Sequence, residues 1–157
     1  MQIKKTREEF LNLYQVLSQL GNLKGVKFAY TIAKNKEAIK PELVAIQEAG
    51  QTKDNYKEFE KERVGLNEKY ALKDEKGQPV IKGDNYQIED KETYDKAYNE
   101  LIEKHKEAID ERDAQIKEVN ELVKEEIEMD LKTLPLSLVP EDITVKQMES
   151  LSIIITE

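Results

Sequence analysis

The chain has 157 residues and a net charge of −8, and 38% of its residues are hydrophobic while 37% are charged. A compact domain usually carries about 45–50% apolar and about 25% charged residues, so this composition excludes a thick core and favours long helices that share a narrow apolar seam. The absence of cysteine excludes disulfides and thiolate metal sites.

The sequence indicates neither a signal peptide nor a membrane span. The basic stretch Met1–Arg7 is not followed by an unbroken apolar segment, and the longest apolar run, Ile153–Ile155, is far too short to cross a bilayer. We therefore expect a soluble, cytoplasmic protein that makes no membrane contact.

Residues 6–20 predict a first helix. Thr6 and Glu9 have the spacing of a capping box, in which each side chain bonds the backbone N–H of the other residue. Apolar residues then recur at three- and four-residue steps, as one stripe of a helix requires: Phe10, Leu13, Tyr14, Leu17 and Leu20. Gly21 and Asn22 supply the stop signal.

Residues 25–71 predict a second, longer helix. Its apolar stripe consists of Ile32, Ile39, Leu43, Ile46, Phe59, Leu66 and Tyr70. Pro41 has no backbone N–H and its ring crowds the preceding turn, so we expect the helix to be kinked or broken near 37–41. The polar stretch 47–55 contains Gly50, and it either bends the helix or is simply solvated.

Residues 72–90 predict a small β-hairpin. Turn-forming residues lie on both sides of the short apolar stretch Pro79–Ile81, and polar and apolar residues alternate over Tyr86–Ile88. We expect two strands, at about 78–82 and 85–89.

Residues 91–126 predict the third long helix. Four apolar residues repeat at seven-residue steps, namely Ile102, Ile109, Ile116 and Val123. A second, partly polar line has the same spacing: Tyr98, His105, Arg112, Val119 and Glu126. Such a repeat implies a helix that winds around a partner. The simplest partner is the 25–71 helix folded back antiparallel, and pairing between two chains is the alternative.

The tail, 127–157, has a different pattern. Alternation over Glu126–Leu131 predicts a strand, two prolines keep 134–140 extended, and Glu141, Asp142 or Thr144 opens a short helix. Its apolar side chains either cover the first helix and the base of the hairpin or form a patch for a partner or a second copy. The candidate partner-binding residues are Leu136, Leu138, Val145, Met148, Leu151 and Ile154.

These elements predict a mainly α fold in a single elongated domain, 1–157. Its main feature is an antiparallel, coiled-coil-like hairpin of long helices with a small β-hairpin at its tip. The first helix and the strand-and-helix tail pack at its base.

The sequence contains no recognisable catalytic motif. It lacks a cysteine nucleophile, a G-x-S-x-G turn and a glycine-rich phosphate loop. Its one histidine, His105, lies on the seam. At such a position we interpret it as a packed or register-setting residue rather than a general base. The acidic clusters at 110–113 and 125–130 have no shaped loop around them, so solvated carboxylates are the default. We expect no enzyme activity, no metal and no cofactor.

Charge is unevenly spread along the chain. Residues 1–40 carry eight Lys and Arg against three acids, whereas residues 73–157 carry twelve against 23 acids. The simplest interpretation is attraction between the two arms of one hairpin. Two alternatives are nucleic-acid contact at the basic end, with Tyr14, Phe28 and Tyr30 for stacking, and imitation of nucleic acid by the acidic part. The negative total charge and the place of Tyr14 in the apolar stripe disfavour nucleic acid as the partner.

Three stretches resemble short proteins of unassigned function from tailed bacteriophages: Asn67–Pro79, Glu126–Leu131, and Leu134–Ser137 with Ile143–Met148 and the final apolar run. None of them is a chemical motif. The resemblance implies a viral origin, hence the host cytoplasm, and it implies no reaction and no catalytic residues.

The leading hypothesis is a phage accessory protein that binds a host or viral protein through an extended helical surface, without chemistry. The alternatives are a structural or assembly component of the virion that forms homo-oligomers, and an acidic nucleic-acid mimic or nucleic-acid-binding protein.

Overall fold

The computed structural model describes residues 1–157, and it confirms a mainly helical fold with small antiparallel strand pairs. Internal contacts divide the chain into two compact units, whereas the sequence predicts one domain. Unit 1 contains Met1–Gly50 and Lys117–Glu157, and unit 2 contains Gln51–Ile116. None of the six α-helices has both the length and the apolar character that a membrane span requires.

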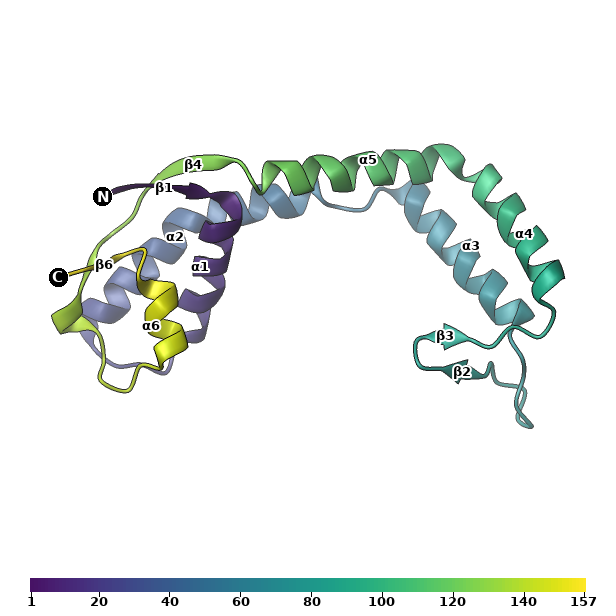
Figure 1. Ribbon diagram of the computed structural model, residues 1–157, viewed down its shortest axis with the longest axis horizontal. Coiled ribbons are helices and arrows are strands. Elements are labelled where there is room, and N and C mark those ends of the chain that lie inside the picture. The colour runs from purple at the N-terminus through teal and green to yellow at the C-terminus, as the bar shows by residue number, and fades with distance from the viewer. The chain divides into compact units, whose positions relative to one another are not determined.

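Unit 1 begins with a strand that the sequence pattern did not reveal. β1 (Gln2–Thr6) pairs antiparallel with β4 (Glu126–Asp130), and Ile3 lies opposite Met129 (Figure 1). β4 is the predicted acidic strand. β1 was missed because its pairing is non-local: the strand is short and polar, and Lys4 finds its partner across the ladder, where its Nζ lies 2.9 Å from Glu126 Oε2.

The first helix, α1 (Arg7–Gln19), begins where the sequence predicts. The Thr6 hydroxyl accepts the backbone N–H of Glu9 at 3.2 Å, and the Glu9 carboxylate accepts the backbone N–H of Thr6 at 2.9 Å. The two residues of this capping box are only three apart in the sequence, so the start of the helix can be predicted from the sequence alone. Phe10, Leu13 and Leu17 face the core.

The second helix, α2 (Val26–Ala49), runs through Pro41, so the chain is not broken near 37–41 and the alternative, a kink there, stays a prediction. Pro41 and Glu37, whose carbonyl loses its helical donor, both lie on the exposed face, where water satisfies that carbonyl. The interruption lies at 50–53 instead. Gly50 caps α2 by donating its backbone N–H to the Ile46 carbonyl at 2.9 Å, and α3 (Asp54–Tyr70) follows.

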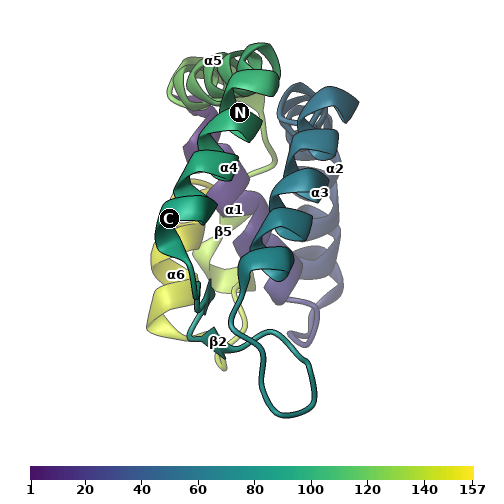
Figure 2. The ribbon, with the colours of Figure 1, turned by 90° about the vertical axis from the view of Figure 1, so that its right-hand side faces the viewer.

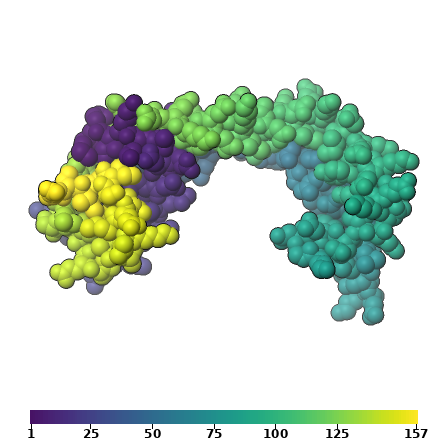
Figure 3. All heavy atoms as spheres, viewed as in Figure 1, coloured from purple at the N-terminus to yellow at the C-terminus, as the bar shows by residue number.

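The C-terminal part of unit 1 closes over α1 and α2. β5 (Leu134–Pro135), the 3-10 turn η1 (Leu136–Leu138), α6 (Val145–Leu151) and β6 (Ile155–Thr156) follow β4 in the chain. β5 and β6 pair in parallel, and α6 packs on α1. Figure 3 shows these C-terminal residues, in yellow, against the N-terminal residues, in purple. Chain ends distant in sequence therefore share one core.

A buried polar residue ties α2 to this layer. Asn35 is fully buried, and its amide accepts the Lys132 backbone N–H at 2.7 Å and donates to the Lys132 carbonyl at 2.9 Å. Both ends of the amide are thereby satisfied, which removes the usual cost of burying it.

Unit 2 contains α3, the predicted small hairpin and α4 (Lys91–Lys104). The hairpin is shorter than expected, with β2 (Ile81–Lys82) antiparallel to β3 (Asn85–Tyr86). α4 packs beside α3 (Figure 2). The longer coiled-coil-like hairpin inferred from the sequence stays a prediction.

The helix predicted at 91–126 is interrupted at His105, where α4 ends, and α5 (Lys106–Leu122) follows. Neither proline nor glycine causes the interruption. The imidazole is 10% exposed, its centroid lies 5.7 Å from that of Phe59, and its Nε2 lies 3.3 Å from Glu62 Oε1. His105 is therefore a packed residue at a change of helix direction.

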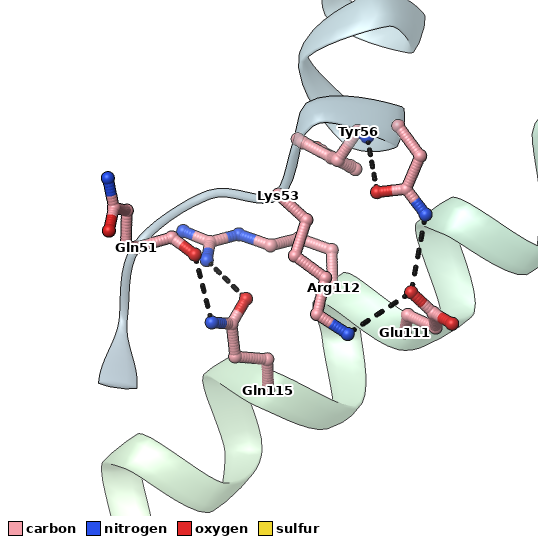
Figure 4. Close-up of polar contacts among 7 residues, drawn as sticks. Gln51, Lys53, Tyr56, Glu111, Arg112 and Gln115 are labelled. Carbon is pink, nitrogen blue, oxygen red and sulfur yellow. Dashed lines mark hydrogen bonds and ion pairs between the residues drawn. The ribbon is translucent and has the colours of Figure 1, made fainter. Parts of the chain in front are cut away.

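Polar side chains hold the segment before α3 on α5 (Figure 4). Lys53 Nζ and Asn55 Nδ2 each lie 3.3 Å from Glu111 Oε2. Gln115 donates its side-chain amide to the Gln51 carbonyl at 3.0 Å. We call these five residues the polar clasp. It joins the segment before α3 to α5 through hydrogen bonds and an ion pair.

Candidate protein-binding groove

Helix α2 has two apolar faces, although a surface helix of a globular protein normally needs one. Phe28, Ile32 and Ile39 point into the core of unit 1. Val26 and Tyr30 lie on a different face and are 89% and 57% exposed. Exposed alanines continue this second stripe at helical spacing, which then consists of Val26, Ala29, Tyr30 and Ala33. The fold does not use this stripe.

A groove of about 380 Å³ lies between the end of α1 and the first half of α2. Its floor is made of buried core residues: Leu17, Leu20, Phe28 and Ile32. Small residues line its sides, namely Ser18 and Gly21 from α1 and the following loop, and Ala29 and Ala33 from α2. Because these side chains are small, another backbone can approach both helices closely. Ala29 and Ala33 belong both to the groove and to the exposed stripe, so the two features form one surface.

The segment that forms the groove is rich in lysine. Residues 17–40 contain five lysines and one acid, Glu37. Glu37 pairs with Lys34 at 2.7 Å, and this hydrogen bond raises the pKa of Lys34 and lowers that of Glu37. Lys36 lines the groove, with its Nζ 5.5 Å from the Tyr14 ring centroid. The remaining lysines, Lys24, Lys27 and Lys40, form no ion pair within the chain. Their charge remains for a partner.

The groove holds no pair of side chains arranged for acid–base or nucleophilic chemistry. Its one hydroxyl, on Ser18, donates to the Tyr14 carbonyl at 2.8 Å, as a helical serine commonly does. What the groove offers is shape, apolar area and positive charge, which are properties of a binding surface.

The six candidate partner-binding residues of the tail do not form one patch. Leu151 and Ile154 are fully buried in the core of unit 1, so the folded chain does not offer them to a partner. Leu136 and Val145 are 50% and 76% exposed, and Leu138 and Met148 are half-buried. The assignment of Leu151 and Ile154 is corrected, because both fill the layer that covers α1.

The predicted seam divides in a similar way. The buried positions of α4 and α5 are Leu101 and Ala108, each one residue before an isoleucine of the seven-residue repeat. One residue is about 100° around a helix, so the isoleucine line lies beside the buried line. Ile102, Ile109 and Val123 are half-buried, and Ile116 is 43% exposed. In the second predicted line Tyr98, His105, Arg112 and Val119 are half-buried. Its last member, Glu126, is exposed and lies in β4, outside the helix.

The sequence pattern alone did not single out the groove. Tyr30 entered only as a candidate for stacking, and Val26, Ala29 and Ala33 were not assigned. A second apolar stripe on residues 26–33, beside the stripe through Ile32 and Ile39, is the signal that points to them.

Comparison with known proteins gives no relative: no protein-family model, no curated protein and no solved structure matches the chain. The functional argument therefore rests on the groove itself.

Proposed function

We propose that this chain is a non-catalytic, phage-encoded accessory protein that binds a host or viral protein in the host cytoplasm through the α1–α2 groove. The observation that carries the proposal is the exposed apolar stripe of α2 along the groove. An exposed apolar surface with a polar rim is typical of an interaction site.

The partner segment is an amphipathic helix with acidic flanks. A groove between two packed helices accepts a third helix, and the small side chains of Ala29, Ala33 and Gly21 allow close approach. Val26 and Tyr30 would each bury apolar area against it, and burying a large apolar side chain contributes roughly 1.5–3 kcal/mol. Acidic residues of the partner would face Lys24 and Lys27, which strengthens encounter and orientation more than affinity.

Two alanines of α2 provide a matched test. Ala33 lines the groove, whereas Ala45 is exposed on the same helix outside it. In affinity capture from host lysate, Ala33→Glu should lose the protein that the wild type retains, because it places a bulky carboxylate where an acidic helix must lie. Ala45→Glu should retain it.

A synthetic peptide of the acidic helical segment of that protein should then bind the wild type and not Ala33→Glu. Equal recovery by both variants would refute the groove as the contact surface. Recovery that nuclease abolishes, and that falls steeply as salt rises, would move the assignment to nucleic acid.

A role in virion assembly is the second candidate, supported by exposed apolar residues outside the groove, among them Ile116, Leu136 and Val145. In this case the isoleucine line of α4 and α5 pairs with a helix of another copy, as the seven-residue repeat predicts. Analytical ultracentrifugation separates the two roles. Assembly gives species that grow with concentration and that Ile116→Asp abolishes, whereas the accessory role gives one small species.

A further inference from the structure

Within unit 2, α3 and the start of α4 lie near the β2–β3 hairpin (Figure 1). A separate, polar pocket of about 310 Å³ is lined by residues of these three elements. Its lining is Arg63, Val64 and Asn67 from α3, Asp84, Asn85, Tyr86 and Ile88 from the hairpin, and Tyr94 from α4. This volume is at the lower end of the range of small-molecule sites, so the pocket fits one ring rather than an extended ligand.

One wall of the pocket is held in place by the fold. The Tyr94 hydroxyl donates to the Asn67 side-chain oxygen at 2.7 Å. The Tyr94 ring stacks on Tyr98 at 5.8 Å with an interplanar angle of 16°, and Tyr70 meets it edge-on at 6.0 Å. Burial raises the pKa of Tyr94, so its hydroxyl stays protonated. An aromatic side chain fixed in this way is a preorganised surface.

The polar groups around this wall have no partner in the chain. Asp84 and Asn85 are exposed and Tyr86 is half-buried, and the Asp84 carboxylate, the Asn85 side-chain amide and the Tyr86 hydroxyl make no hydrogen bond within the chain. The N–H groups of the Asn67 side chain are also unbonded, although its oxygen is used. Gly83, with φ +63°, forms the turn that places Asp84 and Asn85 at the rim. The pocket thus has acceptors and donors interleaved over a short distance.

The charge of the lining favours a neutral ligand. Arg63 is engaged by Glu60 through two hydrogen bonds, at 3.0 and 2.8 Å, so its charge is neutralised within α3. The one other charged residue of the lining is the Asp84 carboxylate, which repels phosphates and carboxylates. No group of three or more His, Asp or Glu side chains is placed to hold a metal ion.

We propose that this pocket binds a neutral pyranose sugar, independently of the groove in unit 1. Each sugar hydroxyl both donates and accepts, which matches a carboxylate beside amide N–H groups. Asp84 accepts from one hydroxyl, Asn67 and Asn85 donate to others, and the C–H face of the ring packs on Val64, Ile88 and the tyrosine wall.

The test is a titration of the full-length, isotope-labelled protein with methyl pyranosides of glucose, galactose, mannose and N-acetylglucosamine, followed by NMR chemical shifts. At least one sugar should shift the amide signals of residues 84–88 saturably, with a Kd of about 1–10 mM. Asp84→Asn, which keeps the shape of the side chain, should weaken binding about tenfold because it removes a charged acceptor. Asp110→Asn, an exposed control on α5, should leave the Kd unchanged.

Two outcomes would overturn the proposal. One is no saturable shift at the pocket with any pyranoside up to about 50 mM, which corresponds to a negligible affinity. The other is saturable binding that Asp84→Asn and Asn67→Ala both leave unchanged, because the ligand would then lie elsewhere. The spectra of both variants also report directly whether unit 2 remains folded.

Discussion

Each of the two units of this chain is stabilised internally by a different kind of interaction. Unit 1 has a continuous apolar core of twelve buried residues, from Ile3 to Ile154. Unit 2 has four buried apolar residues, Phe59, Ala71, Leu101 and Ala108, and depends on the polar clasp and on stacked tyrosines. Core burial contributes more than exposed ion pairs do. We therefore expect unit 1 to be the rigid part and unit 2 to open at a lower free energy.

This difference fits the two proposed sites. A groove that orders a partner helix loses less affinity when its floor is already fixed, and the groove floor belongs to the core of unit 1. A pocket for a single ring needs only local order, which Tyr94 and its three neighbours provide.

The largest effect is expected from a substitution at the centre of the unit 1 core. Phe10→Ala should destabilise unit 1 by about 3–5 kcal/mol, because Phe10 is fully buried and its loss leaves a cavity. Val64→Ala, at a 40% exposed position of unit 2, should cost far less. Urea unfolding followed by circular dichroism measures both. Similar effects of the two changes would refute the claim that unit 1 holds the main core.

The second effect concerns the buried amide. Asn35→Ala leaves the Lys132 backbone N–H and carbonyl without their partner in a part-buried setting, which should cost about 1–3 kcal/mol. Asn12→Ala, at an exposed position of α1, is the control. Amide exchange at Lys132 should accelerate in the first variant alone. Unchanged protection there would show that this contact does not hold α2 to the strand layer.

A smaller effect tests the polar clasp of unit 2. Glu111→Gln removes the carboxylate that accepts from Lys53 and Asn55, so amide exchange over residues 51–56 should accelerate. The nearby Glu107→Gln, also exposed on α5, should change nothing. Raising salt should reproduce part of the effect in the wild type, because the ion pair is solvent-exposed. If the amide exchange rates of residues 51–56 change neither in the variant nor with salt, the clasp does not order this segment.

The smallest effect is a pH dependence in unit 1. The hydrogen bond from the Thr6 backbone, followed by that from Lys5, lowers the pKa of Glu9 from its ordinary value of 4.5. A carboxylate with a lowered folded-state pKa contributes stability above its unfolded pKa and loses it as pH falls through the folded value. The urea concentration at half-unfolding should therefore decrease as the pH is lowered below about 4.5. Glu9→Gln should flatten this dependence, whereas Glu8→Gln, at an exposed position, should not.

Local signals made part of this fold predictable from sequence. The capping boxes at Thr6 and Thr144 depend on residues three apart, and α1 and α6 follow them directly. The turn at Gly83 likewise marks its hairpin. Non-local contacts were invisible: β1 acquires its structure from β4, more than a hundred residues away. Pro41 does not break α2, because a proline is tolerated where its lost hydrogen bond faces water.

The candidate site illustrates the same limit. The seven-residue repeat points to the isoleucine line, yet Leu101 and Ala108, one residue earlier, are the residues that the fold buries. Likewise, the apolar content of the tail suggested a partner-binding patch, whereas Leu151 and Ile154 are buried in the core of unit 1. An apolar pattern predicts which residues need cover, and only the packed chain shows which of them the fold has already covered.

Site-specific photo-crosslinking tests the central claim most directly. A benzophenone side chain at Tyr30, beside the groove, is compared with one at Val64 in unit 2 after irradiation in host lysate, and the crosslinked peptides are identified by mass spectrometry. The account predicts that Tyr30 captures an acidic, amphipathic helical segment of one protein, that Val64 does not, and that Ala33→Glu abolishes the crosslink. Crosslinks from Tyr30 to nucleic acid, or to no defined segment, would contradict it.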